Sequence, residues 1–184
     1  AYLACREVVR LGLNLLPAKF DWKKSLLEWG FHENRMFLRA YHQLAMWMED
    51  REDWKEAIQI YTNLLAVSPM DNLGVRHQLP RLWLHTGNLT ALLRHCKAQA
   101  DDASPEITYT YPLALILKGD LEKAKPLLAD ARQRLPLVAK ELLKKRHTRP
   151  KSFMPGYITH GGADQAYVYW QDYGAFWMDS ETAM

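Results

Sequence analysis

The sequence has 184 residues, a net charge of +3, 48% apolar residues and 24% charged residues. This composition is typical of a globular chain with a hydrophobic core, and the small positive charge does not favour a nucleic-acid partner. No apolar run approaches the roughly 20 residues that a membrane-spanning helix needs, which excludes a protein of that class.

All elements predicted along the chain are helices. An amphipathic pattern covers residues 2–15, and because Ala1 already lies within it we expect an upstream segment. Helix pairs are predicted at 34–50 with 54–67, 72–86 with 89–100, and 105–118 with 121–134, and a further helix ends near Arg146. The predicted divisions are N-terminal helices with a candidate degenerate repeat at 1–33, helix pairs at 34–146, a Pro-, Gly- and base-rich linker at 147–162, and a C-terminal capping helix with its tail at 163–184.

The two cysteines indicate the compartment. Cys5 and Cys96 lie far apart in the sequence and both fall in helical patterns. Two reduced thiols fit a reducing environment, so we expect a cytoplasmic protein without a disulfide.

Local signals mark the helix ends. Asp53, Asn88 and Asp120 occupy positions where N-caps are expected, and Gly87 and Gly119 occupy positions where a helix should end. These five residues predict the turn between the two helices of a pair.

Two prolines interrupt predicted first helices at the same place. Pro80 lies seven residues before Gly87, and Pro112 lies seven residues before Gly119. A proline within a helix removes one hydrogen bond, so a similar bend is expected in both helices.

The helix pairs repeat at a regular interval. Ala57, Ala91 and Ala124 are separated by 34 and 33 residues, and a proline follows twelve residues after the first and the last of them. A small residue early in a second helix lets the first helix pack closely, so we expect each alanine to be buried within its own pair. An interval of about 34 residues is that of the tetratricopeptide repeat.

One sequence segment gives a more specific family resemblance than the repeat interval does. The run RMFLRAYHQLAMWMEDREDWKEAIQIYTNLLAVSPMDNLGVRHQL resembles a subgroup of tetratricopeptide repeat proteins that includes the suppressor-of-tumorigenicity type and many bacterial chains. The resemblance covers roughly residues 33–178, although Ser68, Met70 and Leu73 depart from the subgroup's Asn-Pro-Asn-Asp-Asn-Gln-Gly pattern. It implies an all-α fold, a right-handed α–α superhelix of the solenoid type, and a protein-binding scaffold without catalytic residues.

In repeats of this type the first helices line a concave groove. The register set by the glycines places nine side chains there: Arg39, His42, Met46, His77, Arg81, His85, Glu106, Tyr109 and Leu113. Basic, imidazole and aromatic groups suit a protein or peptide partner that carries carboxylates. Two alternatives remain open: the groove is merely solvated, or the C-terminal helix of the chain fills it.

The C-terminal helix is the most aromatic segment. Its predicted packing face contains Ala163, Ala166, Tyr167, Trp170 and Trp177, and we expect the two tryptophans to pack on the helices between residues 105 and 146. Tyr169 and Phe176 would remain on a second face, available for an interface.

Motifs for chemistry are missing from the sequence. It contains no HExxH, CxxC or GxSxG motif and no phosphate-binding loop, so we predict no enzyme activity, no metal and no cofactor. The basic run KELLKKRHTRPK is interpreted as a solvated helix end. The predicted function is a non-catalytic protein- or peptide-binding scaffold. The alternative is an auxiliary or regulatory helical domain of a larger enzyme or complex.

Overall fold

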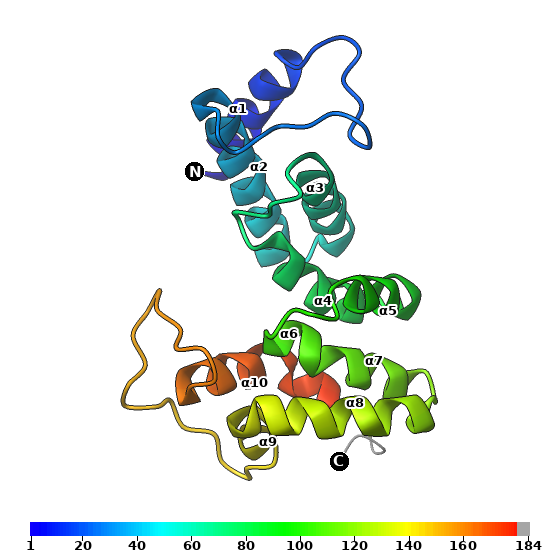
Figure 1. Cartoon of the computed structure of the whole chain (residues 1–184). Helices are drawn as coiled ribbons and strands as arrows, with labels where there is room; N and C mark the ends of the chain where they lie inside the picture. Colours follow the sequence, from blue (N-terminus) through cyan, green and yellow to red (C-terminus); the bar gives the residue numbers. More distant parts are fainter. Residues whose placement is uncertain (180–184) are drawn as a thin grey trace. The chain divides into compact units, whose positions relative to one another are not determined.

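The structure, a computed structural model, describes residues 1–179, and the regular secondary structure in that range consists of helices joined by loops (Figure 1). Its described residues form ten helices and no strand beyond one isolated bridge between Met154 and Tyr157. The prediction of an all-α chain is confirmed. The chain divides after Thr86 into two compact units, and the predicted tail at residues 180–184 lies outside the described range.

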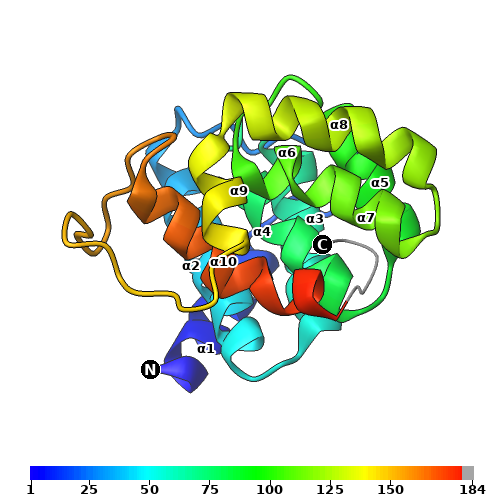
Figure 2. The same cartoon turned by 90° about the horizontal axis from the view of Figure 1, so that it is seen from below.

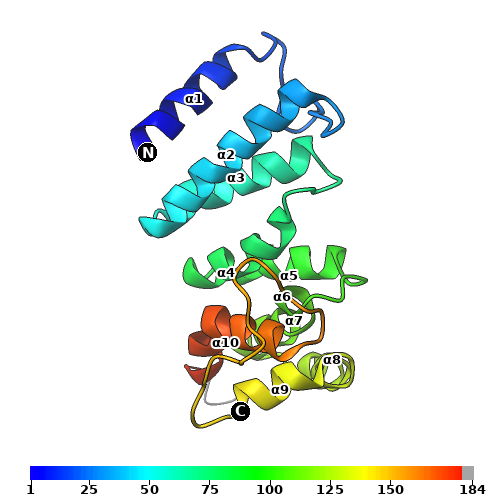
Figure 3. The ribbon, with the colours of Figure 1, turned by 90° about the vertical axis from the view of Figure 1, so that its left-hand side faces the viewer.

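The N-terminal unit contains four helices that pack in chain order: α1 (Tyr2–Asn14), α2 (His32–Asp50), α3 (Trp54–Val67) and α4 (Val75–His85). Figure 3 shows α1, α2 and α3 as successive neighbours. Ala45 and Ala57 are completely buried, and such small side chains allow helices to approach closely. Tyr61 and Leu38 fill the core beside them.

The C-terminal unit contains six helices: α5 (Leu89–Ala98), α6 (Pro105–Thr108), α7 (Thr110–Leu117), α8 (Leu121–Arg134), α9 (Pro136–Leu142) and α10 (Ala163–Met178). Helix α7 packs on α5 and α8, and α10 packs mainly on α9 (Figure 2). Its core is rich in tyrosine, because Tyr109, Tyr169 and Tyr173 are each no more than 1% exposed.

The turns within helix pairs share one geometry. Asp53, Asn88 and Asp120 each accept a hydrogen bond from the backbone N–H three residues later, which confirms all three predicted N-caps. The residue before each cap has a positive φ, which is 59° at Glu52, 66° at Gly87 and 83° at Gly119. Glycine adopts this conformation without strain, so Glu52 is the unfavourable member of the three.

The predicted helix at 105–118 is divided in two. Helix α6 ends at Thr108 and α7 begins at Thr110, with Tyr109 between them. Pro112 has no N–H to donate to the carbonyl of Thr108, so one helical hydrogen bond is missing at the interruption. Pro80 has the same effect on hydrogen bonding, but α4 continues through it.

The three repeat alanines are not equivalent. Ala57 and Ala124 are buried, as predicted, at 0% and 2% exposure. Ala91 is only half-buried, so the prediction is wrong for this residue. A regular interval fixes where a small residue falls in a helix, but not how much of its surface neighbouring side chains cover.

Helix α10 is rotated relative to its predicted orientation. Its buried face contains Ala166, Tyr169, Tyr173 and Trp177, with residues three and four apart. Tyr169, which was expected to be available for an interface, is completely buried, and its hydroxyl lies 3.2 Å from Thr110 Oγ1 and accepts a bond from Trp177 Nε1. Trp170 is half-buried and stacks instead on the His147 ring, 3.7 Å between centroids.

Candidate functional site

The nine predicted groove residues belong to two different units. Six lie on α2 and α4 of the N-terminal unit: Arg39, His42, Met46, His77, Arg81 and His85. Glu106, Tyr109 and Leu113 lie on or beside α6 and α7 of the C-terminal unit. We therefore describe the two sets separately.

Arg81 is engaged within its own unit. Its guanidinium pairs with the carboxylate of Glu49 on α2, and the Tyr61 hydroxyl donates a hydrogen bond to the same carboxylate. The side chains of Arg81 and Glu49 are only 23% and 11% exposed. Burial first, and then the bond to Glu49, raise the pKa of Tyr61. This internal neutralisation leaves Arg81 poorly suited to recognise an acidic peptide, contrary to its predicted role.

The histidines near this cluster are packing residues of different kinds. His42 is half-buried, its ring lies 5.5 Å from that of Tyr61, and its Nε2 is buried without a hydrogen-bond partner. Burial lowers the pKa of His42, although the charges of Glu49 and Asp71 oppose the shift. His85 is exposed and stacks on Trp54 at 4.4 Å. His77 is half-buried.

The remaining members of the first set lie at the surface. Arg39 is exposed, and its guanidinium lies over the Trp29 ring, 5.3 Å from the centroid. Met46 is 43% exposed. Within this unit, therefore, the predicted residues do not form one continuous cationic surface.

The predicted residues of the C-terminal unit are mostly core. Leu113 is completely buried and Tyr109 is 1% exposed, so neither lines an open surface along a first helix as predicted. The Tyr109 hydroxyl donates to the Leu135 carbonyl at 2.9 Å. Burial raises the pKa of Tyr109 to about 12, against the opposing influence of the Arg132 charge. Glu106 is half-buried.

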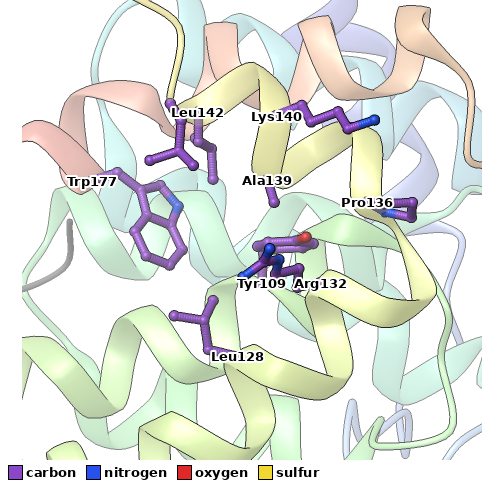
Figure 4. A pocket seen from close by; sticks show the side chains of 9 residues that line it. Tyr109, Leu128, Arg132, Pro136, Ala139, Lys140, Leu142 and Trp177 are labelled. Atoms are coloured by element: carbon purple, nitrogen blue, oxygen red, sulfur yellow. The ribbon is translucent and has the colours of Figure 1, made fainter.

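Sequence reasoning missed a groove in the C-terminal unit. It has a volume of about 510 Å³ and is lined by residues of α8, α9, the end of α10, the position between α6 and α7, and the position after α9: Tyr109, Leu128, Arg132, Pro136, Ala139, Lys140, Leu142, Leu143 and Trp177 (Figure 4). Figure 4 shows Tyr109 on the floor, Leu128 and Trp177 facing each other across the space, and Arg132 beside Tyr109. We call this feature the α8–α9 groove.

Leu143 extends the apolar lining to the surface. Its side chain is 70% exposed and immediately follows α9. Exposed leucines are unremarkable when isolated, but this one continues the lining of a hollow. The sequence signal for the groove was weak, because residues from 109 to 177 meet only after the chain folds.

The charges of the α8–α9 groove are of one sign. Arg132 and Lys140 are its charged lining residues, and neither has an ion pair among the described residues. Two nearby cations outside the lining are paired, Arg134 with Asp130 at 3.4 Å and Lys144 with Glu141. Glu141 is 3% exposed and also contacts His147 Nδ1 at 3.1 Å.

The side chains of the described lining carry few reactive groups. Among residues 1–179 the lining has one hydroxyl, that of Tyr109, and no thiol, imidazole or carboxylate. Over residues 1–179, no group of three or more His, Cys, Asp or Glu side chains has the arrangement of a metal site. Cys5 and Cys96 are free, and burial raises the pKa of Cys96 to about 12. No described helix has the length and apolarity to cross a membrane.

Comparison with known proteins identifies a different family from the one the repeats resemble. A family model described as Tcf25, transcriptional repressor TCF25, matches residues 14–165. The match includes the lining of the α8–α9 groove except Trp177. No curated protein and no solved structure matches the chain.

This match overturns the expected membership in the tetratricopeptide repeat proteins, including the suppressor-of-tumorigenicity type. The 33- to 34-residue interval reflects the spacing of helices α3, α5 and α8, in which Ala57 and Ala124 are buried and Ala91 is half-buried. Such an interval identifies a manner of packing, and several families can share it.

Proposed function

The chain belongs to the transcriptional repressor TCF25 family, and we propose that it is a non-catalytic helical module that binds a protein partner through the α8–α9 groove. The observation that carries this proposal is the groove itself. Protein-binding hollows combine an apolar lining with a few polar groups, and buried aromatic residues commonly provide most of the binding energy. Trp177 and Tyr109 border the hollow but are 3% and 1% exposed, so its accessible apolar surface comes mainly from Leu128, Ala139 and Leu143.

Further features belong to the same proposal. The recurrence of one cap geometry at Asp53, Asn88 and Asp120 supports an α–α superhelical array with α10 as its C-terminal cap. The family's description as a transcriptional repressor supports a nuclear site of action, rather than the cytoplasmic one expected from the sequence, and a partner that takes part in transcription.

The proposal is tested by capturing partners with matched variants. Leu143→Asp introduces a charge at an exposed groove position, so the fold should remain intact while capture of a groove-bound partner is lost. Leu15→Asp makes the same change at a leucine that is 86% exposed on the N-terminal unit. A specific partner, identified by mass spectrometry, should bind the unchanged chain and Leu15→Asp but not Leu143→Asp. Equal capture by both variants would exclude the groove.

A second candidate function follows from the outer face of α1. Ala4, Val8, Leu11 and Leu15 are spaced by four, three and four residues, and all are exposed. A neighbouring face of the same helix packs on α2, where Gly12 lies against Phe37 and Val9 is buried. A helix with two apolar faces is typical of one packed between two neighbours. This stripe supports the alternative of an auxiliary helical domain within a larger complex.

The same two variants distinguish the alternatives. If α1 docks the chain onto another component, Leu15→Asp should abolish capture and Leu143→Asp should leave it unchanged. Thermal unfolding of both variants, followed by circular dichroism, provides the control for folding.

A further inference from the structure

We infer that the partner segment bound by the α8–α9 groove is a short acidic amphipathic helix, with leucine or aromatic anchors and a carboxylate three or four residues from them. This inference rests on the proposed function, because it names the ligand class of the same groove. It depends on three properties of the lining: the sign of its charges, the absence of internal partners for them, and its apolar depth.

The sign of the charges selects an anion. Arg132 comes from α8 and Lys140 from α9, so cations lie on two separate walls of the groove. Figure 4 shows Arg132 and Lys140 among the side chains that surround the hollow, and both residues are exposed. Since no lining residue within the described range 1–179 carries a negative charge, a cationic segment would meet repulsion there without compensation.

Because these two cations have no ion pair among the described residues, they can bind a carboxylate of the ligand without first breaking an internal pair. Asp130 and Glu141, the acidic residues on α8 and α9 near the groove, already pair with Arg134 and with Lys144. Arg132 and Lys140 keep their charges available in the described structure. A guanidinium beside an apolar floor can bind a carboxylate through two parallel hydrogen bonds, which gives a specific geometry as well as attraction.

The volume and apolar lining of the groove favour a ligand with large apolar side chains as anchors. A hollow of about 510 Å³ lies within the range that accommodates one or two large side chains. Leu128, Leu142 and Leu143 provide aliphatic contacts, and Trp177 provides an aromatic wall. Anchors and carboxylates must therefore alternate along the ligand so that each reaches its own part of the lining.

A helix satisfies this alternation. Residues three and four apart lie on one face of a helix, so an anchor and a carboxylate at that spacing can enter the groove together. The surrounding surface adds a general attraction, because Lys145, Arg146, Arg149 and Lys151 follow α9 and are all exposed. Such exposed charges accelerate the association of an acidic segment more than they stabilise the complex.

The test is a selection with the 184-residue chain and a displayed library of random 12-residue peptides. Selected peptides should combine Leu, Phe or Trp with Asp or Glu at a spacing of three or four, and their enrichment should disappear with Leu143→Asp. The affinity of a selected peptide is then measured by fluorescence anisotropy for Arg132→Glu, Lys140→Glu and the control Lys145→Glu. Lys145 is exposed and lies outside the lining, so its reversal is matched to that of Lys140.

We expect Arg132→Glu to weaken binding by on the order of tenfold or more, and Lys145→Glu to weaken it by no more than a few-fold. Selection of neutral or basic peptides that still require Leu143 would overturn the acidic ligand but leave the groove as a binding site. Equal effects of Arg132→Glu and Lys145→Glu on affinity would also overturn the inferred acidic ligand. The groove cations would then contribute only long-range electrostatic attraction and no direct contact. Failure to select any peptide that requires Leu143 would count against the inference and the proposed function together.

Discussion

Arg81 in the N-terminal unit and Arg132 in the C-terminal unit illustrate two uses of the same side chain. Arg81 pairs with Glu49, which also accepts a hydrogen bond from Tyr61, so its charge stabilises the contacts among α2, α3 and α4. Arg132 lines an apolar groove and has no ion pair among the described residues. The difference shows that a cation on a helix face can either be neutralised within the fold, as Arg81 is, or line a surface hollow without an ion pair among the described residues, as Arg132 does.

The contrast extends to the surroundings of each residue. Around Arg81 the polar groups are close together and mutually bonded, which makes the cluster part of the structural framework. Around Arg132 the neighbours are Tyr109, Leu128 and Ala139, which provide apolar surface for a ligand. Variants of the first cluster should therefore change stability, and variants of the groove cations should change binding.

The largest expected effect is the loss of a groove wall. Trp177→Ala removes a side chain that is 3% exposed and that donates a hydrogen bond to Tyr169 at 3.1 Å. It should lower the free energy of unfolding by about 3–5 kcal/mol, because a large cavity remains in the core. Trp170→Ala is the control, since Trp170 is half-buried and should cost less. Equal losses in urea unfolding would show that the core assignment of α10 is wrong.

The next largest effect is a difference in stability between variants at the Arg81 cluster and at Arg132. Glu49→Ala leaves the partly buried Arg81 guanidinium and Tyr61 hydroxyl without their shared acceptor. We expect a loss of about 2–4 kcal/mol in the free energy of unfolding. Arg132→Ala should change it by less than about 0.5 kcal/mol, because an unpaired surface cation contributes little. Chemical denaturation measures the free energy of unfolding of both variants. If Arg132→Ala destabilised the chain as much as Glu49→Ala, the proposed difference between the two arginines would be wrong.

A smaller effect tests the shared turn geometry. Glu52 has a φ of 59°, whereas Gly119 occupies the corresponding turn with a φ of 83°. Glu52→Gly should stabilise the chain by up to about 1 kcal/mol, and Gly119→Ala should destabilise it by about 1 kcal/mol. A methyl group at position 119 meets no atom within 4 Å, so backbone strain is the expected cause. Thermal melting measures both changes, and shifts of the same sign would contradict the equivalence of the turns.

The smallest effect concerns pH and the N-terminal unit. Burial lowers the pKa of His42 below its ordinary value of 6.5, so the unfolded chain binds more protons as the pH falls below 6.5. The free energy of unfolding should therefore fall with decreasing pH in that window. His42→Leu should reduce this slope, because it removes the group and its unpaired Nε2. His85 is exposed as a residue, but partial desolvation of its ring also lowers its pKa, so it should preserve part of the slope. An unchanged slope in His42→Leu would show that other groups cause it.

The sequence predicted helix ends correctly where they depend on interactions between residues a few positions apart. The side chains of Asp53, Asn88 and Asp120 bond to backbone groups three residues away, so their role is visible in a short window. The break before Thr110 coincides with the hydrogen bond that Pro112 cannot donate. The sequence predicted only a bend at this place.

The site depended on contacts that no short window contains. Arg81 and Glu49 are 32 residues apart, so the neutralisation of Arg81 could not be derived from the helical register alone. Likewise, the buried face of α10 is set by Thr110 and its neighbours, 59 residues before Tyr169. The interval of the alanines indicated helix pairs, but the family followed only from the match over residues 14–165.

The most direct measurement is photocrosslinking from inside the groove. The photoreactive residue p-benzoylphenylalanine replaces Leu143 in one chain and Leu15 in another, since both leucines are exposed. Each chain is irradiated in a nuclear extract, with and without Arg132→Glu. We predict a discrete crosslinked protein from position 143 that is strongly reduced by Arg132→Glu, and none of that mass from position 15. A crosslink from position 15 alone, or one from position 143 that is insensitive to Arg132→Glu, would contradict a partner held by the unpaired cations of the α8–α9 groove.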